Sequence, residues 1–299
     1  MSPSPLVADG LGKRFRRDWA LRDLTLTIPM GAVVGLAGPN AAGKSTLLSL
    51  AAGMLAPTEG SISVLGADPL ANAEVLADVG YVAQGAPLYR SFRVADTIEY
   101  ARRTNSRWDR EIAVELLTRI DSRAKVSALS AGERARLALA LALGKRPQLV
   151  LLDEPFASLD PLAGRELLQL LMDGVAELGA TVVVASHVVA DIQRVCDHIV
   201  LLSSGCVRLE GDVEELLESH RLLTGPRRPL GSIRGVREVV RERHSGRQLT
   251  LLAITDGPIV DPSWTVDPVS LEELLLAYMA PERLPTPRTA ERVPLRWHG

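Results

Sequence analysis

The chain has 299 residues, of which 46% are hydrophobic and 23% charged, and this composition allows a sizeable core. A formal net charge of −2 and an aromatic content of 4% argue against a nucleic-acid-binding surface, so no nucleic-acid partner is expected. No apolar stretch approaches the roughly 18 residues of a membrane span, and no secretory signal is visible, so any role at a membrane would require a partner.

The first third of the chain predicts strands around one helix. Alternating residues predict strands within 6–28, and the apolar run 32–37 predicts a buried strand. A helix is predicted at 47–52, and short strands are predicted at 61–65 and 80–83.

The middle of the chain predicts helices and then a strand-helix alternation. Between 94 and 120 the apolar residues recur at helical spacing, and a second helical segment covers 133–143. Strands at 148–152 and 181–185 then alternate with helices at 161–178 and 188–195. This alternation predicts an α/β fold with a substantial parallel sheet.

The composition changes beyond Gly211. Helices are predicted at 213–217 and 271–279, with a strand at 248–253 between them. The segment 281–299 is polar and rich in proline and arginine, which predicts a disordered tail.

One glycine-rich stretch lies between a predicted strand and a predicted helix. It consists of Gly38, Pro39, Asn40, Ala41, Ala42, Gly43, Lys44, Ser45 and Thr46. It matches the G-x-x-x-x-G-K-[ST] phosphate-binding loop in the structural context that this motif requires. Backbone N–H groups and a helix N-terminus would hold the phosphates, Lys44 would reach the β- and γ-phosphates, and Ser45 would bind Mg²⁺. The loop predicts a nucleoside triphosphate site and leaves its task open.

Four further motifs follow in order. They are Gln84 after a strand, Leu-Ser-Ala-Gly-Glu at 129–133 before a helix, Asp153-Glu154 after a buried strand, and Ser186-His187 after the next strand. With the phosphate loop, this set resembles the ATP-binding cassette (ABC) ATPases over residues 6 to about 211. The resemblance implies a P-loop NTPase core with a mixed, largely parallel sheet, an antiparallel β-subdomain and a helical ABC subdomain. The ATPase domain would span 1–220, with its helical subdomain at about 88–144, followed by a small C-terminal α/β accessory region at 221–280.

The motifs suggest roles for individual side chains. Asp153 ends a buried strand, where a carboxylate can hold Mg²⁺ beside Ser45, although a helix N-cap is an alternative. Glu154 is the candidate catalytic base. The resemblance further implies that His187 is the switch histidine at the γ-phosphate, and that Gln84 contacts Mg²⁺ and the attacking water.

Two more predictions concern the base and a second subunit. Phe15 lies where the family places an aromatic ring that stacks on adenine, and Trp19 is the nearby alternative. Ser130, Gly132 and Glu133 begin a helix whose positive end, in the family, faces the ATP of the opposite subunit. The chain is therefore expected to form a homodimer or to pair with a similar ABC ATPase.

The sequence departs from the family pattern at two places. Ala41 stands where the family usually has glycine, and Ala131-Gly132-Glu133 stands where Gly-Gly-Gln is usual. If position 41 needs a left-handed backbone, alanine costs roughly 1–2 kcal/mol there, and a restored glycine should tighten ATP binding. Hydrolysis is expected to tolerate Glu133.

The predicted function is ATP binding and hydrolysis that power an ABC transporter at the cytoplasmic face of the membrane. Its transmembrane permease subunits would be separate chains. Residues 269–275 and Trp108-Asp109 favour an exporter, and the basic stretch from Arg90 to Arg110 is the expected docking region, although a solvated helix face explains its arginines nearly as well.

Two other functions are alternatives. A soluble ABC ATPase acting on ribosomes or DNA is the alternative, but such proteins usually carry two cassettes or a long coiled-coil insertion. A P-loop GTPase would need an Asn-Lys-x-Asp motif, which the sequence lacks. Copurification with a polytopic membrane protein would separate transport from these alternatives.

Overall fold

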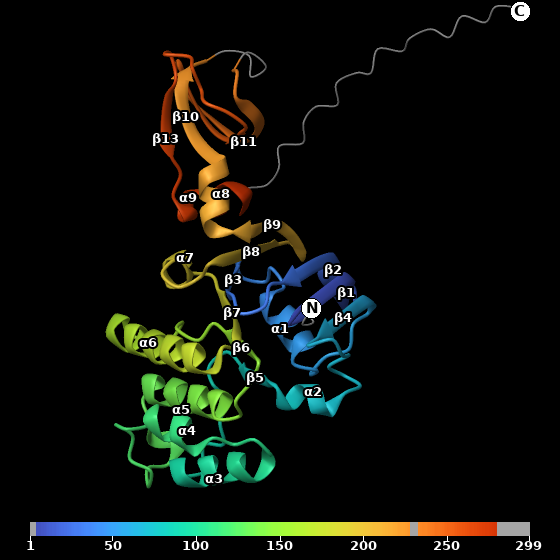
Figure 1. The fold of residues 1–299 in the computed structure, drawn as a ribbon, viewed down its shortest axis with the longest axis vertical. Coiled ribbons are helices and arrows are strands. Elements are labelled where there is room, and N and C mark those ends of the chain that lie inside the picture. Colours follow the sequence, from blue (N-terminus) through green and yellow to red (C-terminus); the bar gives the residue numbers. More distant parts are fainter. Residues whose placement is uncertain (1–3, 228–232, 280–299) are drawn as a thin grey trace, which may run out of the picture.

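Three β-sheets organise the molecule in the computed structural model, which describes residues 4–227 and 233–279 (Figure 1). The predicted disordered tail at 281–299 lies outside the described residues. Among those described, no helix is both long enough and apolar enough to cross a membrane.

The central sheet has the strand order β5-β6-β7-β3-β8-β9. Its strands are β3 (Val33–Ala37), β5 (Val79–Val82), β6 (Leu149–Asp153), β7 (Thr181–Ser186), β8 (His198–Ser203) and β9 (Cys206–Asp212). All neighbours pair in parallel except β8 and β9. Strands β3, β6 and β7 are buried along their whole length, which explains their continuous apolar sequences. The predicted mixed, largely parallel sheet is confirmed.

A second, antiparallel sheet covers one face of the core. It contains β1 (Leu6–Phe15), β2 (Asp18–Ile28) and β4 (Glu59–Val64) in the order β2-β1-β4. Its buried residues pack in one cluster with α1 (Lys44–Ala51) and with strands of the central sheet. The short helix α2 (Ala73–Ala77) follows, with Asn72 as its N-cap. The predicted antiparallel β-subdomain is thus present, and its β1-β2 hairpin lies near the phosphate loop.

The helical region contains α3 (Val94–Thr104), α4 (Arg110–Glu115), a 3₁₀ turn at Val126–Ala128 and α5 (Ala131–Leu143). The helical spacing predicted over 94–120 is therefore interrupted. Asn105 ends α3 in an extended conformation, and the Asp109 carboxylate caps α4 by accepting hydrogen bonds from two backbone N–H groups. Helix α6 (Pro161–Leu178) has the predicted bounds, because Asp160 caps its start and Gly179 ends it in a left-handed conformation.

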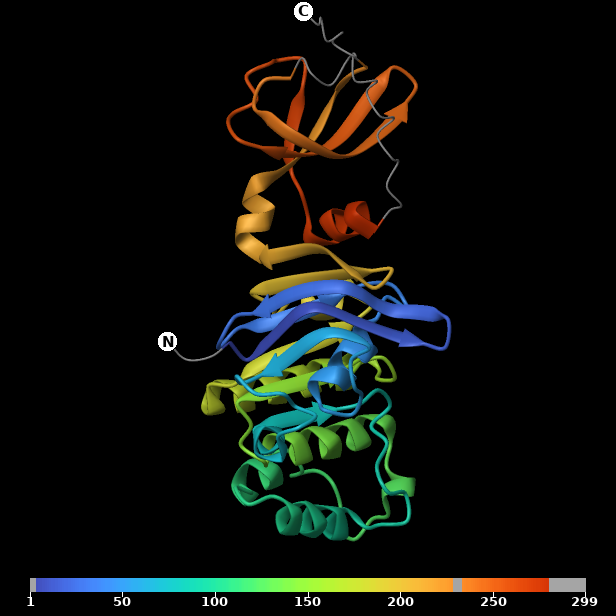
Figure 2. The same cartoon turned by 90° about the vertical axis from the view of Figure 1, so that its right-hand side faces the viewer.

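The C-terminal module, defined here as residues 213–279, has a sheet of its own in the order β11-β12-β10-β13. It comprises α8 (Val213–Ser219), β10 (His220–Pro226), β11 (Val236–Ser245), β12 (Gln248–Thr255), β13 (Thr265–Pro268) and α9 (Leu271–Met279). Helices α8 and α9 lie between this sheet and the rest of the molecule (Figure 2). The sequence predicted only one of these four strands, and the domain boundary at residue 220 stays a prediction.

Candidate active site

The phosphate loop joins β3 to α1 and needs glycine at two positions. Gly38 has φ 152° and Gly43 φ 105°. A Cβ on Gly38 would lie 2.3 Å from the Leu202 carbonyl oxygen, and one on Gly43 would lie 2.5 Å from the Ala20 oxygen. Ala41 has φ 62°, so the position that the family fills with glycine does adopt a left-handed backbone.

Lys44 is buried at the centre of this loop, with 6% of its surface exposed. Its Nζ donates hydrogen bonds to the carbonyl oxygens of Gly38 at 2.7 Å and Pro39 at 3.2 Å. The same Nζ lies 3.5 Å from Glu154 Oε1. These contacts hold the Lys44 side chain beside the loop N–H groups, where a phosphate would bind.

Ser45 and Asp153 are brought together from α1 and β6. The Ser45 hydroxyl donates to Asp153 Oδ1 at 3.0 Å, and Asp153 is buried at the carboxyl end of its strand. Burial raises the pKa of Asp153 above its usual value and the charge of Glu154 adds to this rise, while the Ser45 hydrogen bond and Lys44 oppose it. A hydroxyl and a carboxylate are oxygen ligands that suit Mg²⁺.

Glu154 and His187 form a hydrogen-bonded pair at the ends of neighbouring strands. His187 Nδ1 lies 2.8 Å from Glu154 Oε2, and since a carboxylate accepts, the imidazole Nδ1–H donates. Glu154 is buried and has φ 49°, and its backbone N–H donates to Ala185 at 3.0 Å. A non-glycine residue held in this conformation is typical of functional sites.

A cleft of about 480 Å³ surrounds the phosphate loop. Its lining residues are Phe15, Ala20, residues 40–46, Gln84 and Glu154. The structure therefore places the predicted stacking ring, phosphate loop, glutamine and base around one cleft. Four other predicted residues do not line the cleft but bond to side chains that do. Gly38 and Pro39 accept hydrogen bonds from Lys44, Asp153 accepts one from Ser45, and His187 is bonded to Glu154.

Phe15, and not Trp19, faces the cleft. The Phe15 side chain is 45% exposed, and Lys13 Nζ lies 5.2 Å from its ring centroid. Trp19 instead packs beneath Arg14 and beside Gly12. An exposed ring beside a phosphate loop fits a nucleotide base.

Comparison with known proteins gives this site a family. A family model described as ABC transporter matches residues 21–157. The chain is 35% identical over 226 residues to the Nod factor export ATP-binding protein I of Rhizobium johnstonii, an alignment that covers 73% of this chain and 72% of that protein. This chain belongs to the ABC transporter ATP-binding proteins. It is an ATPase of that family, and it is the ATP-binding subunit of a transporter.

Other ABC relatives show how broad the similarity is. The methionine import ATP-binding protein of Protochlamydia amoebophila is 32% identical over 210 residues, covering 66% of this chain and 62% of that protein. One similar solved structure is a dimeric ATP-binding cassette in a post-hydrolysis state, bound to ADP and phosphate. That structure has a TM-score of 0.63 and 26% identity, and the alignment covers 70% of this chain and 98% of that cassette. The similarity confirms the predicted ABC ATPase fold.

The segment that the ABC family uses as its signature begins α5. Ser130 is the N-cap, its Oγ accepts from the Glu133 N–H at 3.2 Å, and the Ser130 N–H donates to Glu133 Oε2 at 2.8 Å. Sequence reasoning missed this capping box, although Ser-x-x-Glu before a helix indicates one. Ser130, Gly132 and Glu133 are not among the residues that line the cleft of their own chain, and their role toward a second subunit stays a prediction.

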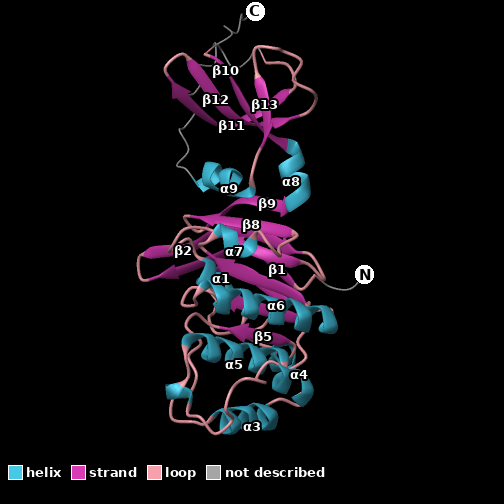
Figure 3. Ribbon diagram, turned by 90° about the vertical axis from the view of Figure 1, so that its left-hand side faces the viewer, coloured by secondary structure: helices cyan, strands magenta, loops and turns pink. Residues whose placement is uncertain are grey.

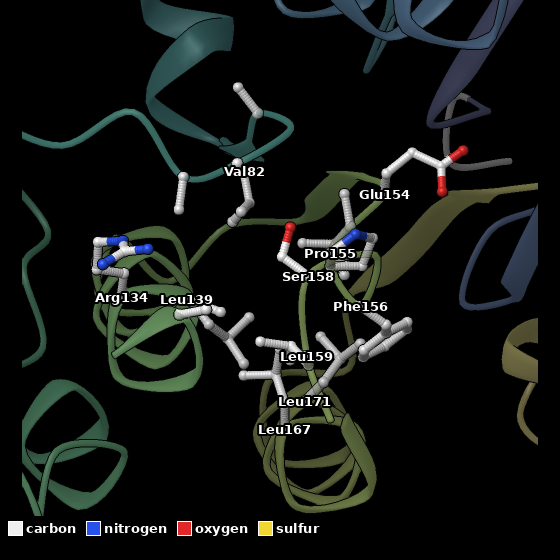
Figure 4. Close-up of a pocket in the computed structure, with 16 residues that line it drawn as sticks. Val82, Arg134, Leu139, Glu154, Pro155, Phe156, Ser158, Leu159, Leu167 and Leu171 are labelled. Carbon is white, nitrogen blue, oxygen red and sulfur yellow. The ribbon is translucent and has the colours of Figure 1, made fainter. Parts of the chain in front are cut away.

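A second cavity, of about 70 Å³, lies where the loop after β5 meets α5 and α6. The side chains of Leu139, Leu159, Leu167 and Leu171 converge there, and Arg134 and Glu154 lie on opposite sides (Figure 4). The loop that carries Gln84 therefore meets the helices across an incompletely filled apolar contact.

Proposed function

We propose that this ABC ATPase works as a dimer at the cytoplasmic face of the membrane and drives permease subunits that are separate chains. The observation that carries the catalytic part is the position of Glu154, with one carboxylate oxygen near Lys44 and the other on His187. Both neighbours fix the carboxylate at the edge of the cleft, where it can take a proton from a water that attacks the γ-phosphorus.

The remaining polar groups support this chemistry. Lys44 would bind the β- and γ-phosphates, and His187 would lie beside the γ-phosphate while its Nδ1 stays on Glu154. Ser45, Asp153 and Gln84 would hold Mg²⁺, which when bound neutralises charge on the phosphate oxygens. Phe15 would stack on adenine, and loop residues 38–46 would surround the phosphates.

The proposed dimer completes the site. Ser130, Gly132 and Glu133 would approach the ATP that is bound to the opposite subunit. A dimeric cassette among the similar structures supports this arrangement. One chain supplies one phosphate loop and one such helix start, so two copies would make two equivalent sites.

An exposed aromatic cluster supports docking to a membrane subunit. Tyr89, Phe92 and Tyr100 have ring centroids 5.2 to 6.5 Å apart, and Tyr89 and Tyr100 are 65% and 53% exposed. The cluster follows the Gln84 loop directly in the sequence. Only a short segment of chain would therefore connect a partner bound at the cluster with the nucleotide site. Exposed aromatic side chains are enriched at protein interfaces.

The arginines in the predicted docking stretch are less available. Arg102 and Arg103 both pair with Glu99, at 2.7 and 2.6 Å, and Arg107 pairs with Asp78. These three arginines are thus already held in ion pairs within the chain, although two of them share one carboxylate. The aromatic cluster is therefore the better candidate for contacts with an amphipathic segment of a permease.

Export is the proposed direction of transport. It is supported by residues 269–275, which lead into α9, and by the Nod factor export relative, but relatives named for import match over a similar length. The soluble alternative, action on ribosomes or DNA, has less support because the protein has near-neutral charge and few aromatic residues.

The test is affinity purification of the tagged full chain from solubilised membranes, with partners identified by mass spectrometry. A polytopic permease should copurify, and the double change Tyr89→Ser and Tyr100→Ser should reduce its recovery without changing ATP affinity. Leu162→Ser, at an exposed leucine of α6, is the matched control. Recovery of ribosomal proteins or DNA instead would replace the transport proposal and leave the ATPase assignment intact.

A further inference from the structure

The switch histidine is followed at once by a very short helix. Helix α7 (Val189–Ile192) starts two residues after His187 and has four residues. Ser186 Oγ accepts from the Val188 N–H at 3.0 Å and lies 3.4 Å from Asp191 Oδ2. A single helical turn is not stable alone, so α7 must be held by packing.

Part of this packing comes from the C-terminal module. Helix α9 contacts α7, and Leu271, Leu274 and Leu275 of α9 are buried in the same apolar cluster as Ile192 of α7. In Figures 1 and 3, which differ by a quarter turn, α9 lies directly beyond α7 along the long axis. The module therefore reaches the segment that carries His187.

The sheet of the module has a separate core. Leu223, Leu249, Leu251 and Trp264 form their own cluster, away from α7. Two leucines of this module thus differ in one respect: Leu274 packs toward the ATPase core, and Leu251 packs inside the module. Both are fully buried. This difference supplies a matched pair of variants.

Helix α9 is fixed at both ends. At its start, Ser270 and Glu273 form a reciprocal cap, with the Ser270 N–H donating to Glu273 Oε2 at 3.1 Å and Ser270 Oγ accepting from the Glu273 N–H at 3.2 Å. Near its end, the Tyr278 hydroxyl lies 2.9 Å from His220 Nε2. His220 Nδ1 is 2.7 Å from the Leu216 carbonyl, which can only accept, so Nε2 accepts from Tyr278. These contacts tie α9 to α8 and β10.

We propose that Leu274 is a positioning residue for His187: α9 holds α7 and thereby keeps the imidazole on Glu154 Oε2. The proposal rests on the function proposed above for His187. Its consequence is that a displacement of the C-terminal module would alter hydrolysis without any contact with the nucleotide.

The experiment compares Leu274→Ala with Leu251→Ala in the full chain, measuring kcat, the Kd of Mg-ATP and Tm. Both variants should lower Tm. Leu274→Ala should lower kcat by about 2- to 30-fold, the range found for residues that couple to a site they do not touch, with an unchanged Kd. Leu251→Ala should keep kcat, and the volume-conserving Leu274→Met should restore it.

A double-mutant cycle separates positioning from general destabilisation. In a His187→Ala background, Leu274→Ala should have no further effect on kcat, because both changes remove the same contact. Equal kcat losses for Leu274→Ala and Leu251→Ala, or a full additional loss in the His187→Ala background, would overturn the proposal.

If Leu274→Ala does not fold, Tyr278→Phe takes its place in the cycle, and an unchanged kcat there counts against the proposal. A His187→Ala protein with normal turnover would instead refute the function proposed for His187.

Discussion

His187 Nδ1 lies 2.8 Å from Glu154 Oε2, although 33 residues separate the two in sequence. They meet because β6 and β7 are parallel neighbours in register, with Asp153 opposite Ala185, so the residues after each strand leave the sheet side by side. The other oxygen of Glu154 lies 3.5 Å from Lys44 Nζ. The glutamate thus connects the phosphate loop with His187.

Replacing Glu154 by glutamine should separate binding from hydrolysis. The amide keeps the shape of the side chain but cannot act as a base, so turnover should fall by about 10²- to 10⁴-fold. ATP affinity, measured by titration calorimetry, should stay near that of the unchanged protein. Glu166→Gln, at an exposed glutamate on α6, is the control and should turn over normally. A Glu154→Gln protein with normal turnover would show that another group accepts the proton.

Replacing Asp153 by asparagine should stabilise the fold at neutral pH. Burial raises the pKa of Asp153, so the charged form is disfavoured in the folded state. The penalty is present at pH values above the raised folded pKa, and it disappears as pH falls below the ordinary value of the unfolded chain. Thermal unfolding should therefore give Asp153→Asn a higher Tm at pH 7.5 and a smaller advantage below pH 3.8, the ordinary pKa of the group. Mg²⁺-dependent hydrolysis should be lost, and an equal advantage at both pH values would contradict the assignment.

Replacing Ala41 by glycine should stabilise the phosphate loop. Ala41 has φ 62°, a conformation that costs a residue with a Cβ roughly 1–2 kcal/mol. Glycine would remove this strain, but its greater backbone entropy in the unfolded chain would cost about 0.5–1 kcal/mol. The free energy of unfolding should rise by at most about 1.5 kcal/mol in urea titrations, and ATP affinity should increase modestly. The neighbouring Ala42 is buried and has no positive φ, so Ala42→Gly should destabilise. The same sign of change in both variants would refute the strain argument.

Replacing Phe15 by alanine should weaken ATP binding. Loss of stacking on a base costs about 1–3 kcal/mol, so Kd should rise by about 5- to 160-fold, while Phe15→Tyr should retain most of the affinity. Fluorescence titration with a labelled ATP analogue would measure both. Trp19→Phe is the control, because Trp19 packs beneath Arg14. An unaltered Kd in Phe15→Ala, or a preference for GTP over ATP, would remove the adenine-stacking role.

Several features of this ABC ATPase could be predicted from the sequence because they depend on short stretches of chain. Glycines, Lys44 and Ser45 define the phosphate loop within nine residues, and Asp160-Pro161 with Gly179 defines the ends of α6. The buried strands β3, β6 and β7 are continuous apolar runs, so their place in a parallel sheet could be predicted as well.

The tertiary structure decided what depends on contacts between distant segments. β11 carries mostly exposed charged residues, so it lacks the apolar alternation that marks a strand, and its pairing with β12 holds it instead. The Tyr89 cluster gathers rings from a loop and from α3, and α9 contacts α7 from a distant part of the chain. Local sequence sets backbone conformation and apolar faces, but which faces meet is set by the packing of the whole chain. The sequence therefore determined which residues are proposed as catalytic, and only the tertiary structure showed that the C-terminal module contacts the helix that follows His187.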